Sequence, residues 1–427
     1  MMGRFVSQRR GRVCATGGWQ PILLAACAAL WVMPAVAAPL SFEEAMQLAE
    51  RNAPSLAADN ARIEAARQAA IPAGELPDPK LMLGIDNLPI TGPDRFNLNR
   101  DFMTMQRIGL SQEVPNSAKR RALVEVAQGN LAVATGAQRI ERLKIRSDTA
   151  QAWIRRYAVE RKLGLFSELY RENRLLNEAV LARVADGRSL AMEGVQPRQE
   201  AAALAERHDQ LERERSEAEA ALRRRIGPAA SEPLVGEIPV WPITSESFTQ
   251  RMQQHPELAV YDSMTRQAEA EVRVAESTKN PDWAVEVAYQ RRGPDFSDMA
   301  SIQFSMDLPV FATRRQDPRI AAKRADLVRI DAEREATLGE HVQMLANDLA
   351  AYQQLDRALQ RQRTTLLPLA KTKVELALAA YGSGQTGLTA LIAARSEWID
   401  ARLKALDLEG QFAMTAARLH YAYGEHP

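Results

Sequence analysis

The sequence is poor in the residues that break or cross-link a chain. Its 427 residues include 22 glycines, 22 prolines and two cysteines, and aromatic residues make up 6%. Both cysteines, Cys14 and Cys27, lie near the N-terminus, so no disulfide framework can hold the rest of the chain. Few turn formers and few aromatic residues favour long helices over a compact aromatic core.

Long apolar runs and an excess of charge are lacking as well. After residue 38 no segment offers the ~20 consecutive apolar residues of a spanning helix, so a membrane crossing would require a closed barrel. The 55 basic and 54 acidic residues nearly balance, which gives no electrostatic basis for binding nucleic acid.

Motifs for catalysis and metal binding are missing too. The five histidines form no i,i+4 pair and no HExxH motif, the segment 382–387 lacks the lysine of a phosphate loop, and no nucleophile elbow occurs. Met103 and Met105 could offer thioethers to copper, but methionine is also a common core filler. We therefore expect no enzyme, no catalytic residue, no cofactor and no metal site.

The first 38 residues have the features of a secretory signal peptide. Four arginines precede an apolar stretch at 22–32, and Ala35-Val36-Ala37 provides a small-residue cleavage pattern. Removing the segment leaves a formal charge of about −3. An alternative is lipidation at Cys27, since Leu24-Ala25-Ala26-Cys27 resembles a lipobox.

The most informative stretch is Trp283–Leu308, which predicts a β-hairpin. Apolar and polar residues alternate at period two in two runs, 283–291 and 299–309, on either side of a turn-rich loop. Such alternation is typical of strands with one face in an apolar medium and one in water.

A weaker copy of this pattern occurs at about 80–88 and 102–114, where Gln106 interrupts the apolar side. The two hairpins could form a small sheet on a soluble domain or belong to a membrane barrel, whose strands alternate in the same way.

The rest of the chain is rich in helix formers and is duplicated. A capping box at Ser41–Glu44 predicts a helix to about Ile71, and a run of about 70 residues from Asn116 to Ala185 contains no proline. Similar segments recur at an offset of about 200 residues, including Leu110–Pro115 and Phe304–Pro309. We predict a first repeat at 39–226, a linker at 227–243 and a second repeat at 244–424. Each repeat contains, in order, a helix, a hairpin, a long helix, a turn and a returning helix.

Four strands are too few to close a membrane barrel, because the smallest known ones have about eight. If the hairpins span a membrane, several chains must pool them, and a trimer would supply about 12 strands.

The duplicated layout resembles TolC-type outer-membrane efflux proteins. The resemblance covers about residues 40–424 and rests on Pro77-Asp78-Pro79 and Asn280–Trp283 before the hairpins, Ser111–Pro115 and Ser305–Pro309 after them, and Tyr381–Leu388 at a turn. It implies a mainly α fold with a β-barrel portion, namely a trimeric barrel of about 12 strands in the outer membrane on a long α-helical periplasmic tunnel. The runs 76–80 and 84–89 are similar to the heavy-metal branch of the family.

The resemblance also implies partners and a function. They are a homotrimer, outer-membrane lipid, a periplasmic adaptor and an inner-membrane resistance-nodulation-division pump, and the chain would be a passive exit duct for small solutes such as heavy-metal cations. The alternative is a periplasmic coiled-coil adaptor that forms no channel.

Candidate site residues follow from this layout. The two helix turns would form the periplasmic mouth or gate, with Asp186, Gly187, Glu193, Gly384, Gln385 and Thr386. Gly187 and Gly384 could instead serve backbone geometry, supplying φ > 0 where two helices reverse. Arg188, Gln385 and Thr386 could contact the adaptor or be plain surface. Glu193 could instead be a solvated acid near a helix N-terminus. The barrel lumen would be lined by Arg107, Glu113, Glu286, Gln290, Gln303 and Asp307. The lipid-facing residues would be Trp283, Val285, Val287, Tyr289, Ile302 and Phe304.

Overall fold

The computed structural model describes residues 39–424. The predicted signal peptide at 1–38 and the candidate lipidation site Cys27 lie outside these residues. Among the residues described, no helix is both long enough and apolar enough to cross a membrane.

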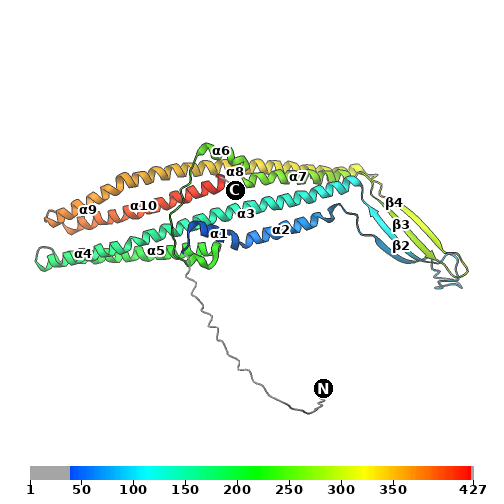
Figure 1. Ribbon diagram of the computed structural model, residues 1–427, viewed down its shortest axis with the longest axis horizontal. Coiled ribbons are helices and arrows are strands. Elements are labelled where there is room, and N and C mark those ends of the chain that lie inside the picture. Colours follow the sequence, from blue (N-terminus) through cyan, green and yellow to red (C-terminus); the bar gives the residue numbers. More distant parts are fainter. Residues whose placement is uncertain (1–38, 425–427) are drawn as a thin grey trace, which may run out of the picture. The chain divides into compact units, whose positions relative to one another are not determined.

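The two halves of the described chain contain similar elements in the same order (Figure 1). The first half consists of α1 (Phe42–Asn52), α2 (Pro54–Ala70), β1 (Lys80–Asp86), β2 (Met105–Val114), α3 (Ser117–Gly164), α4 (Phe166–Ala185) and α5 (Gln196–Ile226). The second consists of α6 (Ser245–Arg251), α7 (Pro256–Ser277), β3 (Trp283–Arg291), β4 (Met299–Met306), α8 (Gln316–Arg361), a π-helical turn (Gln362–Leu366), α9 (Leu367–Gly382) and α10 (Leu388–Tyr423).

Several predicted helix boundaries differ from the structure. The first predicted helix begins as expected, with the Glu44 N–H donating to Ser41 Oγ at 3.2 Å, but it is two helices because Pro54 starts α2. The long run to Ala185 is interrupted at Leu165. The predicted returning helix of the first repeat is α5, which begins at Gln196 after a short 3₁₀ turn.

Strand ends differ as well. β1 stops at Asp86 because Asn87 has a positive φ of 56°, β2 begins at Met105 rather than 102, and β4 ends at Met306 rather than 309. β3 has the predicted bounds.

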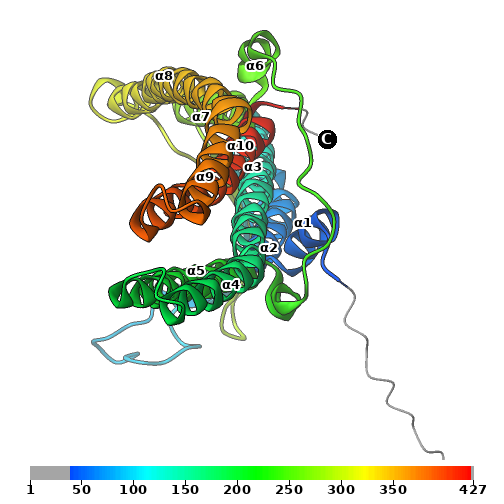
Figure 2. The same cartoon turned by 90° about the vertical axis from the view of Figure 1, so that its left-hand side faces the viewer.

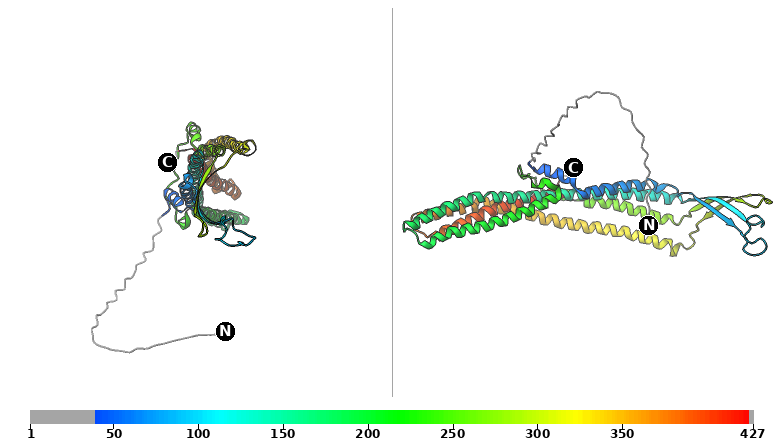
Figure 3. Two further views of the ribbon diagram at one scale, coloured as in Figure 1. Left: turned by 90° about the vertical axis from the view of Figure 1, so that its right-hand side faces the viewer. Right: turned by 90° about the horizontal axis from the view of Figure 1, so that it is seen from below.

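The two hairpins form one antiparallel sheet in the order β1-β2-β3-β4. The central pairing joins the repeats, since β2 lies beside β3 with Leu110 opposite Val287, and Val287 lies opposite Ile302 of β4. The sheet lies at one end of the described residues and the turns α4–α5 and α9–α10 lie at the other (Figure 1; Figure 3, right).

The long helices form a curved layer, with α1, α6 and the linker on one side of it (Figure 2). α3 packs closely against α7 because it carries glycine at the contact: a Cβ on Gly129 would lie 2.9 Å from Gln267 Cα, and one on Gly136 would lie 2.6 Å from a Val260 methyl carbon.

A buried cluster fixes the linker to this layer. Trp153 of α3 is fully buried against Phe42. The Leu40 N–H donates to the Pro233 carbonyl and the Val235 N–H donates to the Leu40 carbonyl, which places Leu40 beside Leu234 in a parallel bridge. The buried Arg156 donates to the carbonyl oxygens of Ala230 and Glu232. The linker is therefore held by specific contacts along its first part.

Candidate functional site

The two predicted turns end their helices in the same way. Gly187 and Gly384 have φ values of +70° and +78°, a conformation that glycine adopts without strain. In the first turn the Arg188 N–H donates to the Arg183 carbonyl at 2.8 Å, and in the second the Gln385 N–H donates to the Ala380 carbonyl at 2.9 Å. Both are Schellman-type helix ends.

Side-chain contacts bring the two turns together. The Arg183 guanidinium lies 4.6 Å from the centre of the Tyr381 ring and donates to the Gly382 carbonyl at 3.4 Å. The Ser189 and Tyr381 hydroxyl oxygens are 3.4 Å apart. Beneath them lies an apolar cluster made by Leu176, Val180, Tyr381, Leu388 and Leu391.

Glu193 lies between the turns, at the start of α10. The Leu388 N–H points to Glu193 Oε1 at 3.5 Å, and the side chain borders a pocket of about 270 Å³. This location suits a carboxylate, because a helix N-terminus attracts negative charge. The helix is α10, from the other repeat, rather than α5, which follows Glu193 in the chain.

The remaining residues of the predicted mouth are exposed. Asp186 and Arg188 form a loose ion pair at 4.0 Å, and their side chains are 59% and 74% exposed. Gln385 and Thr386 lie on the same surface, so the end of the helical section presents polar groups to solvent.

The sheet separates polar from apolar side chains. On one face Arg107 pairs with Glu286 and lies 3.9 Å from Asp86, and Lys80 pairs with Glu113. Gln290 donates to Ser301 at 2.9 Å on the same face, where Gln303 is also found. Asp307 follows the end of β4, and its N–H donates to the Asp282 carbonyl at 3.0 Å.

The opposite face is apolar and exposed to solvent in the isolated chain. It includes residues from all four strands, with exposed fractions from 45% for Trp283 to 73% for Phe304. The set comprises Leu81, Leu83, Ile85, Ile108, Leu110, Trp283, Val287, Tyr289, Ile302, Phe304 and Met306. Val285 is on this face too and is partly buried.

Comparison with known families identifies the second half of the chain. The family described as "Outer membrane efflux protein" matches residues 249–425. These residues are similar to that family. The predicted likeness to TolC-type efflux proteins is confirmed.

Solved structures similar to this chain share its fold. A membrane protein from Pseudomonas aeruginosa has a TM-score of 0.78 at 18% identity, covering 90% of this chain and 92% of that one. CusC has a TM-score of 0.76 at 16% identity (90% and 92% covered), and the Campylobacter jejuni CmeC outer membrane channel one of 0.74 at 15% (90% and 85% covered). No curated protein matches the sequence.

A group of ion pairs that was not predicted from the sequence joins the helices of this chain. Arg395 of α10 lies 3.1 Å from Glu200 of α5 and 3.7 Å from Glu172 of α4. Two helical turns further along α10, Arg402 lies 2.6 Å from Glu168 of α4. The hydrogen bond from Arg402 lowers the pKa of Glu168. The spacing of seven between the arginines and of four between the glutamates was the available signal.

A second group missed from sequence lies where the strands meet the helices. The Asp282 carboxylate accepts from the Asn116 backbone N–H at 2.8 Å and from Lys119 Nζ at 2.5 Å, while Asn116 Nδ2 donates to the Ser277 carbonyl at 3.1 Å. Asn116 also caps α3. These contacts fix the start of α3 to the end of α7, and so set how the sheet is attached to the helices.

Proposed function

We propose that this protein is a passive exit duct of the outer membrane, formed by three copies of the chain. The observation that carries the proposal is the sheet, which has an exposed apolar face, a charged opposite face and, among the described strands, pairing on only one side of β1 and of β4. Unpaired strand edges favour pairing with another chain.

Pairing β1 of one chain with β4 of the next would close about 12 strands into a barrel. The apolar face would then contact lipid, with Trp283, Val285, Val287, Tyr289, Ile302 and Phe304 outside. Water would fill the inside, which Arg107, Glu113, Glu286, Gln303 and Asp307 would line. Their mixed charges suit a duct that binds no solute tightly.

The curvature of the helical layer supports the same assembly. A layer that bends in one direction (Figure 2; Figure 3, left) can form one part of a tube when repeated about an axis. The tube would cross the periplasm, and its open end would be the surface that carries Asp186, Gly187, Gly384, Gln385 and Thr386.

Partners would supply the energy, because a passive wall cannot drive transport. We propose a periplasmic adaptor that contacts Arg188, Gln385 and Thr386 at the turns, and an inner-membrane pump of the resistance-nodulation-division type. Three copies of Glu193 near the axis would attract cations to the opening, although each also stabilises the start of α10 in its own chain.

The proposed cargo is small solutes, heavy-metal cations in particular. The support is the resemblance of residues 76–80 and 84–89 to the heavy-metal branch. A sensitivity profile of a deletion strain across metals and drugs tests it, and unchanged metal tolerance would remove the metal part of the proposal.

A pair of double variants tests the facing of the sheet. Val287→Arg with Phe304→Asp places charges on the apolar face and should abolish heat-stable trimers in the outer-membrane fraction, since charge facing lipid costs about 2–4 kcal/mol at mid-depth. The control is Ser301→Arg with Ser305→Asp, which places the same charges on the polar face and should assemble normally.

Deleting residues 294–298 of the β3–β4 loop should also leave insertion intact. If both double variants assemble equally, the proposed facing is wrong. If the wild-type mature chain is recovered in the soluble periplasm, the duct is wrong and the adaptor alternative gains support.

A further inference from the structure

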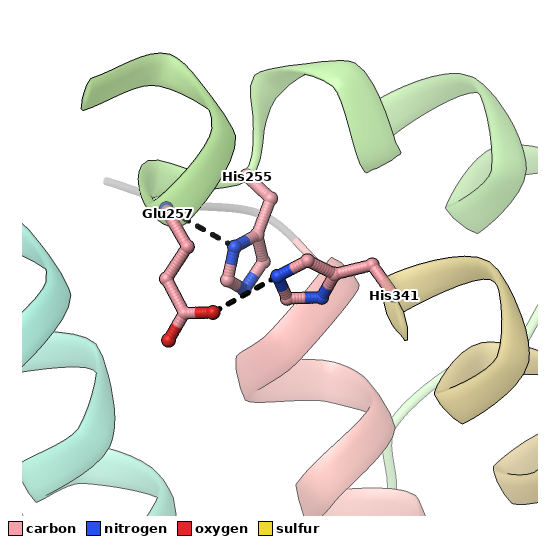
Figure 4. A group of neighbouring side chains, drawn as sticks. All are labelled: His255, Glu257 and His341. Atoms are coloured by element: carbon pink, nitrogen blue, oxygen red, sulfur yellow. Dashed lines mark hydrogen bonds and ion pairs between the residues drawn. The ribbon is translucent and has the colours of Figure 1, made fainter. Parts of the chain in front are cut away.

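Two buried histidines and a glutamate meet where α7 begins. His255 is the residue before α7, Glu257 lies in the first turn of α7, and His341 belongs to α8 (Figure 4). The histidines are only 4% and 3% exposed. Buried polar side chains such as these need hydrogen-bond partners.

The three side chains form one connected group. His341 Nε2 lies 2.9 Å from Glu257 Oε2, and His255 Nδ1 accepts a hydrogen bond of 3.2 Å from the Glu257 backbone N–H (Figure 4). The centres of the two imidazole rings are 4.2 Å apart. One ligand atom from each of the three residues lies within 4.8 Å of the others.

We propose that His255, Glu257 and His341 bind one divalent transition-metal ion of the zinc class. Two imidazole nitrogens and one carboxylate oxygen are a donor set that zinc takes in proteins, with water in the fourth position. Bonds of about 2.0–2.2 Å in a tetrahedron require ligand atoms about 3.4 Å apart. Ligand atoms that now lie within 4.8 Å of one another therefore need to approach by up to about 1.4 Å.

Tyr423 of α10 orients His341 for this role. Its hydroxyl oxygen lies 3.2 Å from His341 Nδ1 and donates to the His341 carbonyl at 3.3 Å. In the metal-free chain, Nε2–H donates to the Glu257 carboxylate, which can only accept. On metal binding the ring proton would move to Nδ1 and donate to the phenol oxygen, and Nε2 would take the metal. An imidazole that binds metal through one nitrogen while the other donates to a fixed oxygen is the usual arrangement at such sites.

The proton on His255 is fixed by the same reasoning. Its Nδ1 accepts the Glu257 N–H and therefore carries no proton. A metal at Nδ1 would replace this hydrogen bond of 3.2 Å, whereas a metal at Nε2, which Figure 4 shows nearer to His341, would replace the ring proton. A metal ion would enter from solvent past the carboxylate, because the Glu257 side chain is 45% exposed while both imidazoles are buried behind it.

A metal here would join the start of α7 to the middle of α8, beside the last residue of α10. The site is distinct from the turns and the sheet, and it does not depend on what the duct carries. Its expected effect is to stabilise the second repeat, since an ion that binds only the folded state raises the stability of that state.

Zinc titration of the full-length chain, purified in detergent and treated with a chelator, tests the proposal. We expect saturable binding of one ion per chain by calorimetry, and a visible absorption spectrum typical of tetrahedral coordination when cobalt is used instead. Both signals should persist in His208→Gln, because His208 packs on Phe166 far along the chain from the site.

Variants at the site should lose these signals. His341→Ala should abolish saturable binding, and Glu257→Gln, which keeps the shape and a hydrogen-bonding side chain, serves if the first variant does not fold. Tyr423→Phe should fold and bind about 10–100-fold more weakly, as expected for loss of an orienting partner. Zinc should raise the unfolding temperature of the wild type and of His208→Gln, but not of Glu257→Gln.

Two results would overturn the proposal. One is wild-type binding no tighter or more saturable than that of Glu257→Gln, which would make the group a hydrogen-bonded core cluster. The other is equal loss of binding in His208→Gln, which would place the metal elsewhere.

Discussion

Arg395 and Glu200 form an ion pair of 3.1 Å between α10 and α5, with side chains only 13% and 8% exposed. The pair links the two helical hairpins near the turns. A buried charge that loses its partner stays desolvated without compensation, so the cost of breaking such a pair is larger than for a surface pair.

Arg395→Ala is therefore expected to destabilise the chain by about 3–5 kcal/mol, measured as a lower midpoint of unfolding. Lys373→Ala is the matched control, because its partner Glu397 and Lys373 itself are both 56% exposed, and it should cost at most about 1 kcal/mol. Adding Glu200→Gln to Arg395→Ala should restore part of the loss. Equal midpoints for the two single variants would show that the buried pair is not special.

Two glycine-to-alanine changes in long helices should have opposite signs. Gly339→Ala in α8 meets nothing within 4 Å and should stabilise the chain by about 0.5–1 kcal/mol, because alanine restricts the unfolded chain and favours helix. Gly129→Ala in α3 would place Cβ 2.9 Å from the Gln267 backbone and should cost about 1–3 kcal/mol. Chemical denaturation measures both, and a shift of the same sign would mean that α3 and α7 do not pack this closely.

The sequence carried different amounts of information about different parts of this structure. Period-two alternation predicted the β3 strand to the residue and placed polar and apolar groups on opposite faces. The joining of the hairpins through β2 and β3 was not predicted, because local alternation says nothing about which strands pair. The break at Leu165 was missed since no proline marks it.

The candidate sites show the same limit. The glycines at the turns were recognisable, because a reversal between two helices favours a residue that adopts a positive φ without strain. The histidine group was not, because a search for i,i+4 pairs finds ligands on one helix. Glu257 and His341 are 84 residues apart and meet only through the packing of α7 on α8.

The Tyr421 phenol should ionise at a higher pH than an ordinary tyrosine. Burial raises its pKa to about 12, from a usual value of 10.0. Because the folded pKa is the higher one, the neutral phenol stabilises the fold fully below about pH 10, and this contribution is lost as the pH rises towards 12. Burial also raises the pKa of Tyr423 to about 12, so ultraviolet titration should show a late phase from both phenols, and this phase should shrink by about half in Tyr421→Phe. An unchanged late phase in that variant would assign it to another tyrosine.

Alanine at the two turn glycines should loosen the end of the helical section. Gly187→Ala and Gly384→Ala each place a Cβ at a positive φ, which costs about 1–2 kcal/mol for an L-residue. Since both positions meet nothing within 4 Å, the cost is conformational rather than steric. Faster amide hydrogen exchange should therefore be confined to residues near the two turns.

The matched control is Gly187→Asn, because asparagine tolerates this conformation better than alanine. Its exchange rates should fall between those of the wild type and Gly187→Ala. If the chain forms the proposed duct, Gly187→Ala should leave outer-membrane trimers intact and should lower the resistance of cells to the exported solute. The reason is that the substitution disturbs only the turn surface proposed to contact the adaptor. Loss of trimers in this variant would mean instead that the turns are needed for assembly, and the adaptor contact would then have to be sought elsewhere.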